Sequence, residues 1–221
     1  MNIFDIIGPV MIGPSSSHTA GAVRLGNMAR SVLGEPVLEA VIGLHGSFAQ
    51  TYRGHGTDVA LVAGLMGWST YDNRIPEAFA YAQTAGLTVR FEMINLGDAA
   101  HPNSARLQLT GNNGGQVTVT GASIGGGRIM ITAVDDFAIE FHGELMTLLI
   151  RHQDQPGAIA AVANILYEQG VNVAKMEVFR TDKGAAALMM LEIDQAINDE
   201  VVKLIAACPQ INSVRKIVPV Q

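Results

Sequence analysis

The sequence predicts an α+β protein of two domains: a mixed α+β domain over residues 1–143 and a ferredoxin-like βαββαβ domain over residues 144–221. Two observations lead to this division. The first region holds most of the glycines and has little regular period, whereas the second alternates strand and helix patterns. With 221 residues, 48% of them hydrophobic, the chain is long enough to bury a core in each domain.

The second domain is predicted from its apolar segments. Strands are expected at 145–150, 171–179, 185–193 and 214–218. The first helix follows Asp154, a capping residue, and has Pro156 in its first turn, while the second is marked from Ile197 to Ile205. This order of elements is that of the split βαβ folds. Because an alternating strand would leave one face to water, the nearly continuous apolar strand 185–193 predicts that the domain pairs with a second copy.

The first domain has shorter and less regular elements. Strands are expected at 37–44, 88–94, 105–109, 116–120, 128–134 and 137–141, and helices at 57–66 and 76–85. The run Gly111–Gly115 (GNNGG) predicts a hairpin, because such turns need residues that tolerate positive φ. The glycine run 121–127 is not followed by a helix, which argues against a dinucleotide loop and favours a close approach of the backbone to a ligand or a partner subunit.

Composition excludes several classes of function. A net charge of −6 gives no basic surface for nucleic acid or anionic membranes, and no apolar run is long enough to span a bilayer. Since the N-terminus also lacks the basic region of a secretory signal, we expect a cytoplasmic protein. Cys208 is the only cysteine, so the chain alone holds no four-cysteine zinc site and no self-contained iron–sulfur cluster, and we expect no metal ligand among its residues.

Three polar stretches, residues 13–21, 45–58 and 101–104, interrupt the first domain, and each contains histidine. In the first stretch, three serines precede His18 and Thr19 at the expected start of a helix. Backbone N–H groups and hydroxyls at such a position can cradle a carboxylate or a phosphate. For a single serine, helix capping is the simpler interpretation. The whole run, Ser15, Ser16, Ser17, His18 and Thr19, favours an anion site.

The second and third stretches hold candidate acid–base groups. His55 lies between Gly54 and Gly56, which allow a ligand to come close, and Asp58 could orient its imidazole or cap the next helix. A structural histidine in a tight turn is the alternative. In the third stretch, His101 precedes Pro102 and Asn103, a combination that suits either acid transfer with carbonyl binding or a simple turn.

The strings IGPSSSHTAG, HGSFAQTYRGHGTD and TGASIGGG, followed by DQPG, resemble the β subunit of bacterial iron–sulfur L-serine dehydratases along the whole chain. The resemblance implies a β-type domain similar to the serine-binding intervening domain of some phosphoglycerate dehydrogenases, followed by an ACT domain. It implies conversion of L-serine to pyruvate and ammonia. It also implies a separate α-type subunit whose cysteines bind a [4Fe–4S] cluster.

The resemblance also implies roles for residues. His55 matches a catalytic histidine, expected to abstract the Cα proton, and His101 matches a second active-site histidine. The run from Ser15 to Thr19, with Asn103, is expected to hold the substrate. In the ACT domain, a free amino acid is expected between paired domains, at the turn after the first strand, with Asn172 entering the next strand, unless the domain serves only dimerisation. The residues of that turn are Asp154, Gln155, Pro156 and Gly157.

Two rival functions remain open on the sequence. A pyridoxal phosphate dehydratase needs a lysine for its Schiff base, and all four lysines lie at or beyond Lys175. That distribution counts against this class. A non-catalytic amino-acid sensor that regulates a partner is the second rival, and the clustered histidines argue against it without excluding it.

Overall fold

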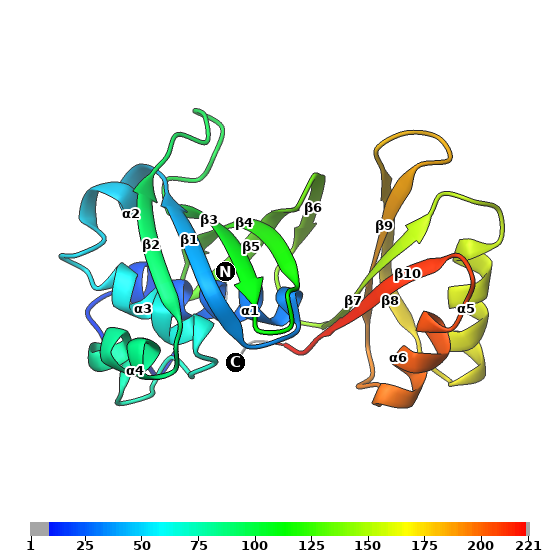
Figure 1. Ribbon diagram of the computed structural model, residues 1–221, viewed down its shortest axis with the longest axis horizontal. Helices are drawn as coiled ribbons and strands as arrows, with labels where there is room; N and C mark the ends of the chain where they lie inside the picture. The colour runs from blue at the N-terminus through cyan, green and yellow to red at the C-terminus, as the bar shows by residue number, and fades with distance from the viewer. Residues whose placement is uncertain (1–8, 220–221) are drawn as a thin grey trace. The chain divides into compact units, whose positions relative to one another are not determined.

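The computed structural model describes residues 9–219 (Figure 1), so predictions that involve residues 1–8 and 220–221 lie outside the described part. The described chain forms two compact units. The first holds residues up to Asp135 with residues 140–142, and the second holds Asp136–Ile139 and Gly143–Pro219. No helix within residues 9–219 is long and apolar enough to cross a membrane.

The first unit is built on a six-stranded mixed sheet with helices packed on it (Figure 1), of which only the start of the last strand, up to Ile139, is grouped with the second unit. The strand order is β2-β1-β3-β4-β5-β6, with β1 and β2 parallel and the pairs β1–β3, β3–β4 and β4–β5 antiparallel. Its strands are β1 (Val37–Leu44), β2 (Thr88–Met93), β3 (Ser104–Gly111), β4 (Gln116–Gly125), β5 (Arg128–Val134) and β6 (Phe137–Phe141). Its helices are α1 (Gly21–Leu33), α2 (Gly46–Thr51), α3 (Thr57–Leu65) and α4 (Ala78–Thr84), with a π-helical turn at Ser16–Ala20 and a 3-10 turn at Ile75–Glu77.

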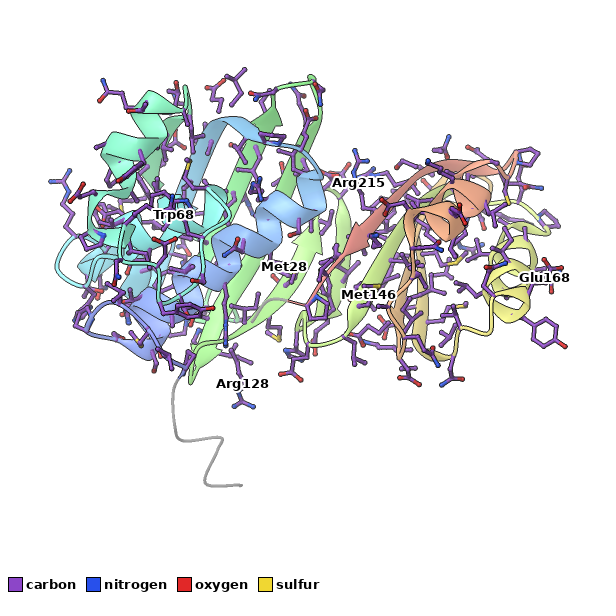
Figure 2. The ribbon with its side chains drawn as sticks, turned by 90° about the horizontal axis from the view of Figure 1, so that it is seen from below. Met28, Trp68, Arg128, Met146, Glu168 and Arg215 are labelled. Carbon is purple, nitrogen blue, oxygen red and sulfur yellow. The ribbon has the colours of Figure 1, made fainter. Side chains whose placement is uncertain are left out.

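Helix α1 lies on strands β3, β4 and β5, and α3 packs on α1 and α4. Met28, labelled on α1 in Figure 2, is fully buried in this layer. Two glycines let α1 and α3 touch through their backbones: a Cβ on Gly26 would lie 2.5 Å from the carbonyl oxygen of Leu61, and one on Gly64 would lie 2.2 Å from that of Val23. This contact holds the first half of α1 against the second half of α3, and it fixes how the two helices that follow the first two polar stretches pack together.

The variant Gly64→Ala should therefore lower the free energy of unfolding by about 1–3 kcal/mol, since the added methyl group forces the helices apart. Thermal denaturation followed by circular dichroism measures this loss. Gly54→Ala is the matched control, because a Cβ there would have its nearest neighbour at 3.6 Å. Equal melting temperatures for Gly64→Ala and the wild type would show that the helices do not depend on the close contact.

The second unit is a four-stranded antiparallel sheet, in the order β10-β7-β9-β8, with two helices on one face. This confirms the ferredoxin-like prediction. Its elements are β7 (Met146–Gln153), α5 (Ala158–Glu168), β8 (Val173–Arg180), β9 (Ala186–Ile193), α6 (Asp199–Ala206) and β10 (Ile211–Ile217). Met189 and Leu191 of β9 face Val162 of α5 and Ile205 of α6 in the core.

Strand β9 is buried on both faces within the single chain. Leu188 and Met190, which alternate with the core residues, are 1% and 0% exposed. The continuous apolar run therefore does not by itself require a second copy, and the predicted pairing stays a prediction.

Three details of the predicted elements are wrong. Asp154 does not cap α5: Gly157 holds the N-cap position at φ +93°, and Pro156 lies in the turn before it. Helix α6 begins at Asp199 after its cap Asn198, so Ile197 precedes it. Strand β4 continues through the first part of the glycine run to Gly125, because its backbone goes on pairing with β5.

Candidate functional site

The serine run forms the π-helical turn that leads into α1. Ser15 caps it, since its Oγ accepts a hydrogen bond from the backbone N–H of His18 at 3.1 Å. Gly13, at φ +118°, lies so close to Thr19 that a Cβ there would meet the threonine side chain at 2.4 Å. Ser15, Ser16, Ser17 and His18 are half-buried, whereas Thr19 is buried. π-Helical turns are uncommon and often occur at functional sites.

His18 joins the first two polar stretches. Its ring lies 4.7 Å from the ring of His55, centroid to centroid, and 5.4 Å from that of Phe48. Its Nε2 forms a hydrogen bond of 3.1 Å with the Oγ of Ser47, and the neighbouring Thr19 donates its hydroxyl to the carbonyl oxygen of His55 at 3.3 Å. Two histidines that are far apart in the sequence are thus in direct contact.

The pair is electrostatically unusual. Burial, and secondly the neighbouring His55, lower the pKa of His18 below its ordinary value. The Nδ1 of His55 is buried without a hydrogen-bond partner in the described chain. The Oγ1 of Thr57 is buried without a partner as well. The Asp58 carboxylate accepts from the backbone N–H of Val59 rather than from His55, so the expected orienting contact is not present. The arrangement offers an unoccupied imidazole nitrogen beside a ring that favours its neutral form.

The third stretch packs under α2. Phe48 donates its backbone N–H to the carbonyl oxygen of Pro102 at 3.3 Å, and a Cβ on Gly46 would lie 2.6 Å from the same oxygen. His101 Nδ1 accepts from the backbone N–H of Asn103 at 3.1 Å, which closes its own turn. Within residues 9–219, His101 has neither a hydrogen bond nor a ring contact with His18 or His55. The structure therefore brings this loop beside the pair without joining it to the pair.

Sequence reasoning missed Ser47 and Ser123. Ser123, on β4, is fully buried with its Oγ unpartnered, and a Cβ on Gly21 would lie 2.0 Å from that oxygen. Its backbone N–H donates to the carbonyl oxygen of Asn103 at 3.0 Å. The glycine run does allow a close backbone approach, but to the start of the chain's own helix α1. The glycines of this run predicted a close backbone contact, but they did not predict that helix α1 makes it.

The residues of this chain do not fit an iron–sulfur cluster. Cys208 is the only thiol, and its Sγ lies 3.7 Å from the carbonyl oxygen of Leu204 at the end of α6. No three His, Cys, Asp or Glu side chains of the described residues are grouped as metal ligands. A cluster with several thiolate ligands therefore needs cysteines from elsewhere.

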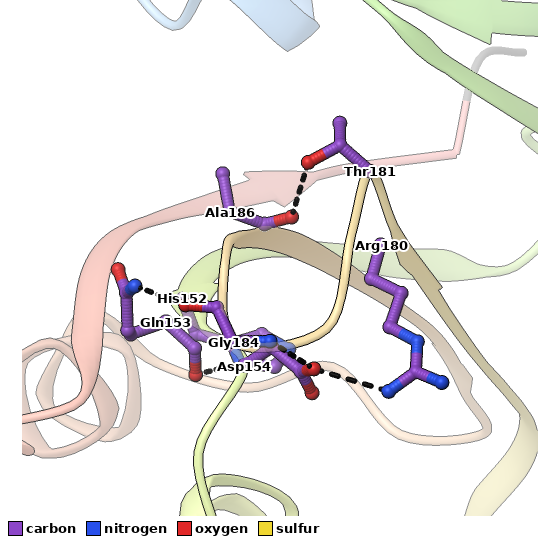
Figure 3. Close-up of polar contacts among 7 residues, drawn as sticks. All are labelled: His152, Gln153, Asp154, Arg180, Thr181, Gly184 and Ala186. Atoms are coloured by element: carbon purple, nitrogen blue, oxygen red, sulfur yellow. Dashed lines mark hydrogen bonds and ion pairs between the residues drawn. The ribbon is translucent and has the colours of Figure 1, made fainter.

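The expected effector turn is held by hydrogen bonds within the second unit (Figure 3). The carboxylate of Asp154 accepts from the backbone N–H of Gly184 at 2.9 Å and pairs with Arg180 at 3.1 Å, and these contacts lower its pKa. Gln155, Pro156 and Gly157 follow it and are exposed. Asp154 does not cap α5 because its carboxylate is bonded to Gly184 and Arg180 instead.

Asn172 lies at the other end of the sheet. It precedes Val173, which pairs with Ile193, whereas the turn adjoins His152, which pairs with Ala187. At about 3.3 Å per residue along β8, the two positions are roughly 20 Å apart within one chain. The side-chain amide of Asn172 already donates to Asp194 at 2.6 Å. One chain therefore does not bring Asn172 and the turn together.

His152 adjoins the same turn. Its side chain is 2% exposed, and its Nδ1 lies 2.9 Å from the carbonyl oxygen of Gln153. Its Nε2 is buried without a partner in the described chain. The sequence shows only that His152 comes before the turn, and it does not predict that the ring is buried with an unpartnered nitrogen.

Comparison with known proteins shows the family to which the chain belongs. Residues 2–134 match the profile of the serine dehydratase beta chain, and residues 146–210 match that of the ACT domain. The chain belongs to the serine dehydratase beta chain family. This confirms the resemblance inferred from the three strings.

Relatives are similar along most of the chain. The "Probable L-serine dehydratase, beta chain" of Bacillus subtilis is 44% identical over 98% of this chain and 97% of its own length. The "L-serine dehydratase, beta chain" of Peptoniphilus asaccharolyticus is 40% identical over 89% and 88%. The D-3-phosphoglycerate dehydrogenase of Bacillus subtilis is 30% identical over 89% of this chain and 37% of its own length, which agrees with the expected relation between the folds.

Proposed function

We propose that the chain is the β chain of an L-serine dehydratase that converts L-serine to pyruvate and ammonia in the cytoplasm. The observation that carries the proposal is the similarity to two such beta chains along nearly the whole length. The contact between His18 and His55 supports it, because it supplies a proton acceptor beside a hydroxyl-rich turn. Formation of pyruvate from L-serine by the assembled enzyme tests the proposal. No specific contact favours a purely regulatory function.

The proposed reaction uses the chain's own residues for binding and proton transfer. The hydroxyls and backbone N–H groups of Ser15, Ser16 and Ser17 bind the substrate carboxylate, with His18 and Asn103 at the edge of the site. Thr19 supports the site by tying the turn to His55 through its hydroxyl. His55 takes the Cα proton of L-serine, and His101 acts as the second acid–base group. The β-hydroxyl leaves as water, giving aminoacrylate, whose imine tautomer is hydrolysed to pyruvate and ammonia.

The low pKa of His18 matters for the proton on His55. Because His18 favours its neutral form, His55 can become protonated without facing a second positive charge in contact. The proposed proton acceptor is therefore His55, with the neutral ring of His18 beside it.

We further propose that the [4Fe–4S] cluster belongs to an α-type partner subunit. The single cysteine of this chain supports that division. The chain's own residues suit substrate binding and proton transfer.

The ACT domain is proposed to bind a free amino acid between two copies of the chain. The turn from Asp154 to Gly157 and Asn172 lie at opposite ends of one sheet, so an antiparallel second copy is needed to bring them to one ligand. Self-association through the ACT domains therefore follows from the proposed site.

L-Serine is the effector to test. Titration calorimetry of the intact chain with L-serine should give saturable heat, and Asn172→Ala should weaken binding by about tenfold, the usual effect of losing one hydrogen bond. Asn112→Ala, an exposed asparagine in the hairpin of the first unit, is the matched control. Binding that is unchanged in Asn172→Ala would remove Asn172 from the site.

A further inference from the structure

Helix α2 connects the three polar stretches, and Ser47 is its only side chain that bonds a ring of the histidine pair. The Oγ of Ser47 lies 3.1 Å from the Nε2 of His18. The next residue, Phe48, lies with its ring against the same imidazole at 5.4 Å. Ser47 thus holds one end of the His18 ring, and the ring of His55 lies 4.7 Å away, tilted by 58°.

The backbone of Ser47 is itself fixed from two sides. Its carbonyl oxygen accepts from the hydroxyl of Thr51 at 2.8 Å. Gly46, at φ +56°, packs on Pro102 of the His101 loop, where a larger residue would collide with the backbone. The hydroxyl therefore has a defined position relative to His18, and that position depends on the third polar stretch.

A hydroxyl is suited to this position. It donates to a neutral imidazole nitrogen and accepts from a protonated one, so the bond persists in either state of the ring. A carboxylate in its place would favour the charged ring and would put two positive charges in contact when His55 takes up a proton. A serine fixes the ring without adding charge.

We infer that Ser47 is a positioning residue, which holds the imidazole of His18 against His55 and links this pair to the His101 loop. Its effect on turnover rests on the proposed function, whereas its effect on the His18 ring does not. The first readout therefore uses the chain alone.

Nuclear magnetic resonance of the ring nitrogens in the isolated, isotope-labelled chain is the primary test. Ser47→Ala should shift the His18 Nε2 resonance and weaken the cross-relaxation between the His18 and His55 rings, while Ser47→Thr, which keeps a hydroxyl, should restore both. Thr84→Ala removes an exposed hydroxyl on α4 and should change neither. An unchanged His18 ring in Ser47→Ala would overturn the inference.

Activity of the assembled enzyme is the second readout. Ser47→Ala should lower kcat/KM for L-serine by about tenfold, the usual effect of one lost hydrogen bond, and Ser47→Thr should recover most of it. A value within twofold of the wild type for Ser47→Ala would contradict the positioning role. If the wild-type complex fails to turn over L-serine, the proposed function falls, and the ring measurement still decides whether Ser47 holds His18.

Discussion

Replacing His55 with alanine in the assembled enzyme should lower the turnover of L-serine by roughly 10²–10⁴-fold, the usual contribution of a general acid or base. The reason is that His55 carries the buried, unpartnered Nδ1 in contact with a histidine that favours its neutral form. Removing the ring leaves His18, whose pKa is lowered by burial, as the remaining imidazole beside the serine run. Steady-state rates of pyruvate formation measure the loss.

Two controls separate chemistry from folding. Ser15→Ala removes a cap and one hydroxyl among several, so its effect on turnover should be smaller than that of His55→Ala. His142→Ala removes a histidine of the same unit whose Nδ1 bonds the carbonyl oxygen of Ile129, and it should leave turnover near the wild-type value. Near-normal turnover in His55→Ala would return His55 to a structural role in its turn.

The strands were predictable where local pattern and burial agree. The bounds of β1, Val37–Leu44, match the predicted segment, because a run of apolar and β-branched residues ends there at a polar loop. The ferredoxin-like order was predictable for the same reason. The start of α5 was not, because Asp154 bonds Gly184 and Arg180 of a distant turn instead of its own helix.

The candidate site was predictable only in part. The sequence indicated which stretches hold polar residues, since serines, histidines and glycines gather there without a period. It did not indicate that His18 contacts His55 while His101 bonds its own turn, because those contacts depend on how α1, α2 and α3 pack. Ser47 was missed for the same reason, as a serine in a short helix has no signature of its own.

The separation of Asn172 from the effector turn is a result of register. The resemblance to ACT domains places both at one ligand site between paired domains. In the sheet, the turn follows the end of β7 that pairs with Ala187, whereas Asn172 precedes the end of β8 that pairs with Ile193. The turn and Asn172 therefore lie at opposite ends of the sheet. Because the two positions are that far apart in one sheet, a ligand that touches both needs a second chain.

The most direct test of the proposed division of labour is an anaerobic assay of pyruvate formation from L-serine, with this chain alone and with a cysteine-bearing α-type subunit. Because Cys208 is the only thiol and a cluster needs several, the isolated chain should be colourless and inactive. The mixture should be coloured and active, and exposure to air should abolish its activity.

Cys208→Ser is the control for this assay and should leave the colour and the turnover of the mixture unchanged, since its sulfur lies at the end of α6 in the ACT domain. The account predicts activity only when both chains are present. Turnover of L-serine by the isolated chain, or loss of the cluster from the Cys208→Ser complex, would contradict it.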